Sequence, residues 1–186
     1  MNGRRHDGGW KQRSARYLFE SRWYRVRQDV VELPSGEPIT YTLIEHPGYA
    51  MVVPLFEDGS VLLERVYRYT VQETLLECPS GGLDGDVPEV AARRELEEET
   101  GLVADEMEPI GSFYGSTGIS NERCFLFLAT GLRETGTMRR EATEQMELER
   151  MPFDRAVELA RSGGVADGAS ALALLLADGR LRARPR

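Results

Sequence analysis

A glycine-rich stretch that leads directly into a helix constrains the fold of this chain more than any other feature. Residues 79–86 hold three glycines, which permit backbone shapes that other residues resist. In the helix predicted after them, Asp86 can act as the cap and Glu89 completes a capping-box-like pair, while Pro88 suits the first turn and Gly101 supplies the stop. The sequence therefore predicts a loop of unusual geometry followed by a helix with well-marked ends.

Three carboxylates gather on one face of that helix. At about 100° per residue, Glu95, Glu98 and Glu99 fall within an arc of about 100°. Like charges at this spacing destabilise a helix unless solvent or cations screen them, and hard divalent ions such as Mg²⁺ bind through oxygen ligands. Taken alone, such a run is usually a solvated face, with Arg94 paired to Glu98. The glycine-rich loop, the marked helix start and the glycine stop together favour a metal site.

Alternating residues predict strands on both sides of this loop and helix. Residues 22–33 and 38–45 flank a turn and predict an antiparallel hairpin, and residues 49–56 and 60–67 flank an Asp-Gly turn and predict a second. The other predicted elements are strands at 74–77, 110–114, 123–129 and 145–150, a polar loop at 133–143, and helices at 153–161 and 169–177.

Composition excludes several classes of protein. A formal net charge of −8 argues against non-specific nucleic-acid binding, which depends on basic surface. The longest apolar run, residues 171–177, is far shorter than the roughly 20 residues of a membrane-spanning helix, and the N-terminus lacks an apolar secretory segment. We therefore expect a cytoplasmic protein that contacts no membrane, with Cys78 and Cys124 as reduced thiols rather than a disulfide.

Residues 94–102 resemble the second half of the box of the Nudix hydrolases, which reads Arg-Glu-apolar-x-Glu-Glu-x-Gly-apolar, at every fixed position. The first half of that box asks for a Gly, five residues and a Glu. Here Asp86 replaces the Glu, and Gly81 precedes it by one residue fewer. Asp86 is therefore left with two possible roles, as a peripheral metal ligand or only as a helix cap.

The resemblance implies a role for each residue of the box. Glu95 and Glu99 would be the principal Mg²⁺ ligands, with Mn²⁺ as the alternative ion, and Glu98 would be a further ligand or the base. The backbone carbonyl of Ser80 would add a metal contact, and Arg94 would orient Glu98. The metals would polarise a pyrophosphate and lower the pKa of the attacking water.

Other stretches resemble the ADP-ribose pyrophosphatases within that family. Residues 64–69 and 75–81 look like the segment that precedes their box, which implies that Arg68 contacts substrate phosphates, although it could instead be a surface strand arginine. Residues 114–118 resemble their Ser-Pro-Gly loop, with Thr117 in place of the proline. The substrate-binding candidates are Arg68, Gly81, Gly82 and Gly118.

The catalytic base in this subfamily often lies on a mobile acidic loop after the core strands. Glu141 and Glu144 occupy that region, and Glu144 is favoured, although both could be solvent-facing loop charges. Glu98, Glu144 and Arg94 are thus the catalytic candidates.

The fold implied is an α/β class, a Nudix α/β/α sandwich around a mixed sheet, with a small N-terminal antiparallel sheet. We expect a flexible leader at 1–16, a dimerisation hairpin at 17–47, the Nudix domain at 48–178 and a flexible tail at 179–186. Because an isolated hairpin is marginally stable, it needs something to pack on, which agrees with a homodimer.

The function implied is hydrolysis of ADP-ribose to AMP and ribose 5-phosphate. A near alternative is another nucleoside diphosphate sugar such as GDP-mannose. A non-catalytic ADP-ribose sensor is disfavoured because all three carboxylates are present, and hydrolysis of oxidised nucleotides or capped RNA ends ranks lower. The physiological substrate and the number of metals remain open.

Overall fold

The computed structural model describes residues 8–136, 138–139 and 146–183 of the chain. The chain divides into two compact units. One unit comprises Met1–Pro47 with Tyr114–Arg123, and the other comprises Gly48–Phe113 with Cys124–Arg186. No helix in the described part of the chain is both long and apolar enough to cross a membrane.

The N-terminal unit is built on a three-stranded antiparallel sheet in the order β1-β2-β3. Its strands are β1 (Lys11–Glu20), β2 (Arg25–Glu32) and β3 (Pro38–Glu45). The predicted hairpin is confirmed as β2 and β3, and Gly36 in the turn between them has a φ of 87°, which favours glycine.

The flexible leader expected at 1–16 is wrong from Lys11 onwards, because β1 starts there and pairs with β2. Most of the side chains of β1 are exposed, so the strand lacks the alternation of apolar and polar residues on which strand prediction depends. Polar pairs accompany its backbone ladder instead, since Lys11 Nζ lies 3.1 Å from Glu32 Oε1 and Arg16 Nη2 lies 2.6 Å from Gln28 Oε1.

The second unit holds two sheets. The order β10-β5-β6 forms one, and β7-β4-β9-β8 forms the other, in which β4 and β9 are parallel and β4 and β7 antiparallel. The strands are β4 (Tyr49–Pro54), β5 (Ser60–Arg68), β6 (Glu73–Glu77), β7 (Ser80–Gly82), β8 (Leu102–Tyr114), β9 (Arg123–Glu134) and β10 (Met146–Pro152).

The second predicted hairpin is correct in its turn and wrong in its pairing. The amide of Phe56 donates to the carbonyl of Ser60 across the turn, and Gly59 has a φ of 78°. Beyond the single bridge between Leu55 and Val61, however, β4 and β5 enter different sheets. Both strands are buried along most of their length, and each lies inside its sheet: β4 pairs with β7 and β9, and β5 pairs with β6 and β10.

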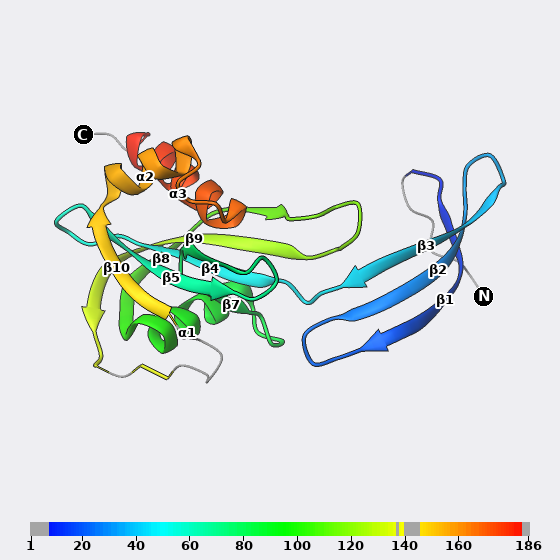
Figure 1. Cartoon of the computed structure of the whole chain (residues 1–186), viewed down its shortest axis with the longest axis horizontal. Helices are drawn as coiled ribbons and strands as arrows, with labels where there is room; N and C mark the ends of the chain where they lie inside the picture. The colour runs from blue at the N-terminus through cyan, green and yellow to red at the C-terminus, as the bar shows by residue number, and fades with distance from the viewer. Residues whose placement is uncertain (1–7, 137, 140–145, 184–186) are drawn as a thin grey trace. The chain divides into compact units, whose positions relative to one another are not determined.

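Helices cover the second unit on two sides, as Figure 1 shows: α2 (Phe153–Ser162) and α3 (Gly168–Arg182) lie together on one side, and α1 (Pro88–Thr100) lies on the other. Alternate residues of β4 face these two layers. Met51 and Val53 belong to the core with α2 and α3, whereas Ala50 and Val52 belong to the core with α1. The predicted α/β/α sandwich around a mixed sheet is confirmed.

Helix α1 ends as predicted but is not capped as predicted. Its C-cap Gly101 has a φ of 69°, and the amide of that glycine donates to the Glu97 carbonyl. At the other end the N-cap is Val87, with no side-chain cap hydrogen bond, so Asp86 does not cap the helix. The carboxylate of Asp86 lies 3.7 Å from Arg94 Nε instead, a contact about two turns into the helix that capping rules do not consider.

The flexible tail expected from residue 179 is wrong as far as Arg182, because α3 continues to that residue. Ion pairs hold this last turn: Arg180 contacts Glu108 on β8, and Arg182 Nε lies 2.7 Å from Asp178 Oδ1. One pair across the fold and one along the helix thus extend α3 past the point where its apolar pattern ends.

Gly179 → Ala is expected to stabilise the protein by about 0.5–1 kcal/mol, because glycine in a helix interior loses more backbone entropy on folding than alanine does. Gly179 lies on α3, and a Cβ there meets no atom within 4 Å. Urea unfolding of the two proteins measures the difference. A lower free energy of unfolding in the variant would contradict the open environment described for this glycine.

Candidate active site

The carboxylates of α1 lie against the short strand β7. The amide of Ser80 donates to Oε2 of Glu99 over 2.8 Å, and Gly81 stands so close to Glu95 that a Cβ added there would overlap its carboxylate. Glu95 is 7% exposed and Glu99 is 5% exposed. Strand β7 is held in place by pairing with Tyr49–Met51 of β4, so the predicted loop and helix meet as one rigid site.

Arg94 joins the helix to the segment before it. One nitrogen, Nη1, donates to Oε1 of Glu95 at 2.5 Å and lies 3.6 Å from Oε2 of Glu98, while Nη2 donates to the Gly82 carbonyl at 2.8 Å. The nearest carboxylate is therefore Glu95, and Glu98 is the more distant one. Partial burial would lower the pKa of Arg94, but Glu95, Asp84 and Glu98 outweigh it and raise that pKa. Arg94 is thus a permanent cation at the centre of an acidic site.

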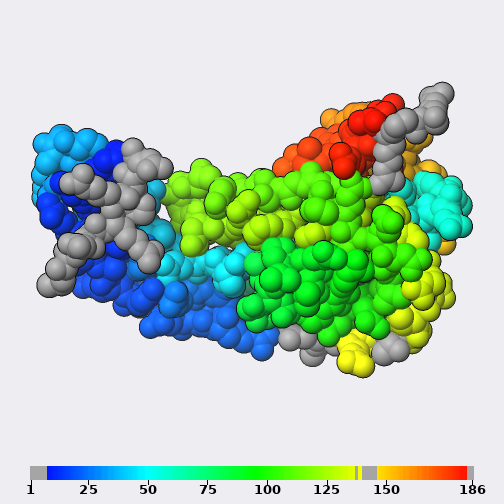
Figure 2. All heavy atoms as spheres, turned by 180° about the vertical axis from the view of Figure 1, so that it is seen from behind, coloured from blue at the N-terminus to red at the C-terminus, as the bar shows by residue number. Residues whose placement is uncertain are grey.

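Glu98 is the most exposed of the three predicted carboxylates, with 35% of its side chain accessible. It borders a cavity of about 240 Å³ lined by Arg94, Glu97, Glu98 and Arg139. The outer side of α1 forms part of the molecular surface, green in Figure 2. A solvent-accessible carboxylate beside a cavity is placed where it can exchange a proton with water.

Arg68 lies on β5 and is held by a carboxylate of β6 that lies outside the Nudix box. Its Nε and Nη2 donate to the two oxygens of Glu77 at 2.8 and 2.5 Å, and Glu77 is buried. These hydrogen bonds are the largest cause of a raised Arg68 pKa, which partial burial opposes and the charges of Asp167 and Glu99 support. Arg68 is therefore a fixed cation within the electrostatic range of Glu99.

Three predicted residues belong to the other unit or fall outside the residues that the structure describes. Glu141 and Glu144 are not among the described residues. Gly118 belongs to the N-terminal unit, where its carbonyl accepts a hydrogen bond of 2.8 Å from the Tyr41 hydroxyl. The cluster of the second unit thus comprises Ser80, Gly81, Gly82, Arg94, Glu95, Glu98 and Glu99.

Two carboxylates that contact the arginines of the site, and one further arginine, were not predicted from the sequence. Asp84 lies 3.5 Å from Arg94, and both carboxylate oxygens of Glu77 accept hydrogen bonds from Arg68. Arg139 borders the cavity that Glu98 also lines. Asp84 has a left-handed φ of 49°, and the Asp-Gly dipeptide at 84–85 is the signal that could have marked a tight turn there. Arg139 lies about forty positions from its neighbours in the cavity, so no local pattern could have placed it.

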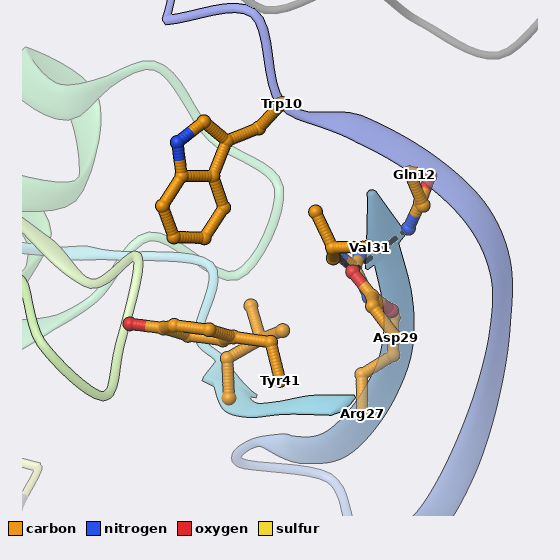
Figure 3. Close-up of a pocket in the computed structure, with 7 residues that line it drawn as sticks. Trp10, Gln12, Arg27, Asp29, Val31 and Tyr41 are labelled. Atoms are coloured by element: carbon orange, nitrogen blue, oxygen red, sulfur yellow. Dashed lines mark hydrogen bonds and ion pairs between the residues drawn. The ribbon is translucent and has the colours of Figure 1, made fainter. Parts of the chain in front are cut away.

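The N-terminal unit contains a separate cavity of about 470 Å³ (Figure 3). The rings of Trp10 and Tyr41 stand edge to face across it, with centroids 6.3 Å apart. Asp29 is buried beside them and accepts hydrogen bonds from Gln12 at 2.8 Å and from Arg27 at 2.8 and 2.9 Å. Its carboxylate is therefore engaged within the sheet.

The donor chemistry of the α1 face fits a hard divalent cation. Glu95, Glu98 and Glu99 supply only oxygen atoms, and the neighbouring strand could add the predicted carbonyl of Ser80. Across the described residues, no three His, Cys, Asp or Glu side chains converge closely enough to hold a metal ion. Glu95 bonds to Arg94 and Glu99 to the Ser80 amide. A cation at this face would therefore compete with Arg94 for Glu95.

Comparison with known proteins agrees with this architecture. Residues 45–174 match the family model of the NUDIX domain, and residues 10–44 match that of the nucleoside diphosphate sugar hydrolase N-terminal domain. The solved structure described as an ADP compounds hydrolase superposes with a TM-score of 0.80 at 21% identity, covering 92% of this chain and 93% of its own. At that identity the likeness concerns the fold alone.

Two curated relatives cover most of the chain. An ADP-ribose pyrophosphatase of Bacillus subtilis is 34% identical over 159 residues, and a methanol dehydrogenase activator of Bacillus methanolicus is 30% identical over 159 residues. Each alignment covers 84% of this chain and 86% of the relative. Because the family model spans more than half of the sequence and its box coincides with the carboxylate face of α1, the chain belongs to the Nudix family.

Proposed function

We propose that this protein hydrolyses the pyrophosphate of ADP-ribose, or of a similar nucleoside diphosphate sugar, with Mg²⁺ as its metal. The observation that carries the proposal is the contact of two α1 carboxylates with β7, where Glu95 and Glu99 are buried against Gly81 and Ser80, with Glu98 on the same helix face. Nudix hydrolases generally need a divalent metal ion. The match of residues 10–44 to a nucleoside diphosphate sugar hydrolase domain supports the class of substrate.

Different residues of the site would bind the metal ion, accept a proton and bind the phosphate. Glu95, Glu98 and Glu99 would hold the ion, which supplies charge neutralisation and a water of lowered pKa. Glu98, as the accessible carboxylate, would accept a proton from the attacking water. Arg94 holds Glu95 through its hydrogen bond, and Arg68, fixed by Glu77, would bind a phosphate oxygen. The products would be AMP and ribose 5-phosphate.

Glu98 → Gln is expected to lower turnover by about 10²- to 10⁴-fold, because the amide can neither accept the proton nor neutralise a cation. The measurement is phosphate release with a coupled phosphatase, in Mg²⁺, from ADP-ribose, GDP-mannose, NADH, diadenosine polyphosphates and nucleoside triphosphates. Glu89 → Gln on the same helix is the matched control, since Glu89 pairs with Arg93 on the exposed surface and the loss of that pair should change turnover by less than about twofold.

The outcomes separate the candidate functions. Preference for GDP-mannose would keep the mechanism and change the substrate. Tight ADP-ribose binding without turnover of any compound would favour a sensor. If Glu98 → Gln keeps the turnover of the wild type, Glu98 is not the catalytic base. Another carboxylate, such as that of Glu144, would then be the base.

The assembly and the compartment are part of the same proposal. The N-terminal unit exposes large apolar side chains, among them Phe19 on β1 and Trp23 in the turn after it, each more than half exposed. A homodimer that buries these side chains would explain their exposure in the single chain, because soluble monomers rarely expose contiguous apolar patches. We expect the dimer to work in the cytoplasm, and light scattering of the purified chain tests its mass.

A further inference from the structure

One arginine of the second unit differs from the others in its ion pairs. Among the described arginines of Gly48–Phe113 and Cys124–Arg186, every one except Arg139 forms an ion pair with a carboxylate. These pairs are expected in a chain with 31 acidic and 23 basic residues, where carboxylates outnumber cations. An arginine left without a carboxylate partner among the described residues is therefore the exception that needs a reason.

Arg139 is fixed at the C-terminal end of the carboxylate face. Its own amide donates to the carbonyl of Glu98 at 2.9 Å, and the amide of Thr135 donates to the carbonyl of Gly101 at 2.8 Å. These two bonds tie the segment after β9 to the last turn of α1. The side chain of Arg139 consequently borders the cavity of about 240 Å³ that Glu98 also lines.

The chemistry of that cavity suits an anionic ligand held beside metal ligands. Glu97 and Glu98 provide acidic groups, whereas Arg94 is already engaged with Glu95 and Gly82. A guanidinium presents a planar fork of donors that matches two phosphate oxygens, and it stays charged at every physiological pH. Of the two arginines that line the cavity, Arg139 is the one whose fork contacts no carboxylate of the described residues.

We propose that Arg139 binds a phosphate oxygen of the nucleoside diphosphate sugar and so contributes to substrate affinity. The inference rests on the proposed function, since it assigns a further contact to the same substrate. The contact forms in the ground state and persists through the reaction, so its loss weakens binding rather than chemistry.

Arg139 → Gln is expected to raise KM for ADP-ribose by about 10- to 100-fold and to change kcat by less than about threefold, since a hydrogen bond to a charged group is lost. Arg139 → Lys keeps the charge without the fork and should give an intermediate KM. Arg133 → Gln is the matched control, because Arg133 lies on the preceding strand β9 and pairs with Asp105 at 2.7 Å. Its KM should equal that of the wild type.

A second readout separates binding from structural effects. Titration calorimetry of ADP-ribose with Mg²⁺, in the Glu98 → Gln background, should show affinity weakened by the same factor when Arg139 → Gln is added. Thermal unfolding of Arg139 → Gln should match the wild type, because the backbone bond to Glu98 does not depend on the side chain. A fall in kcat with unchanged KM and affinity would overturn the substrate contact.

The controls distinguish the two proposals. Wild-type hydrolysis of a nucleoside diphosphate sugar, with KM unchanged in Arg139 → Gln, would overturn the role of Arg139 and leave the proposed function standing. If the wild-type protein neither binds nor hydrolyses any nucleotide of the panel, the proposed function fails and the role of Arg139 fails with it.

Discussion

Gly81 → Ala is expected to lower turnover by about 100-fold or more and to destabilise the fold by about 1–3 kcal/mol. The added methyl group would overlap the carboxylate of Glu95. The backbone of β7 cannot easily move away, because Gly81 pairs with Ala50 and the carbonyl of Pro79 accepts from the amide of Val52 at 2.9 Å. Glu95 must therefore turn out of its place and lose its hydrogen bond to Arg94.

Gly82 → Ala provides the matched comparison for stability. A Cβ at Gly82 would stand 3.4 Å from the Asp84 carboxylate, an ordinary van der Waals contact with a flexible side chain. Its cost in urea unfolding should therefore be clearly smaller than that of Gly81 → Ala. Equal losses in the two variants would show that the effect comes from glycine flexibility along β7 and not from the close approach of Glu95.

The short distance between the Gly81 backbone and the Glu95 carboxylate explains why position 81 is a glycine. Three glycines in residues 79–86 predict unusual backbone shapes, yet neither Gly81 nor Gly82 has a positive φ, and both belong to a short strand. Gly81 is needed for space beside Glu95. Only Gly85, with a φ of 93°, fulfils the conformational expectation.

Features that depend on neighbouring residues are predictable from this sequence. Pro88 and Gly101 mark the ends of α1, and the Asp-Gly turn before Ser60 is present as expected. The carboxylate face follows from helix geometry alone, because Glu98 and Glu99 follow Glu95 by three and four residues.

Features that depend on distant residues were not predictable. The pairing of β5 with β10 joins Ser60 to Pro152, and a turn prediction gives no information on a strand ninety residues away. Strand β1 has no buried apolar face of its own to reveal it. In the site, Arg68 and Glu77 meet because β5 and β6 are paired, and Arg139 reaches Glu98 through a backbone bond across forty residues.

Arg94 → Gln is expected to lower the free energy of unfolding by about 3 kcal/mol in the absence of divalent ions, because it leaves the buried carboxylate of Glu95 without its cation. The guanidinium contacts Glu95 at 2.5 Å, Asp84 at 3.5 Å and Glu98 at 3.6 Å. Urea unfolding in a chelator measures the loss. Arg155 → Gln is the control, since its pair with Glu158 is exposed on α2 and its removal should cost less than about 1 kcal/mol.

Mg²⁺ should stabilise Arg94 → Gln more than it stabilises the wild type. In the wild type a bound cation must displace Arg94 from Glu95, and part of its binding free energy is spent on breaking that hydrogen bond. In the variant Arg94 no longer competes for Glu95 and no longer offsets the repulsion between the carboxylates, so binding of the ion to the folded state is stronger and stabilises it more by mass action. Repeating the unfolding in millimolar Mg²⁺ gives the difference. Equal stabilisation of both proteins would mean that the ion and Arg94 do not share Glu95, and the ligand set would then have to exclude that residue.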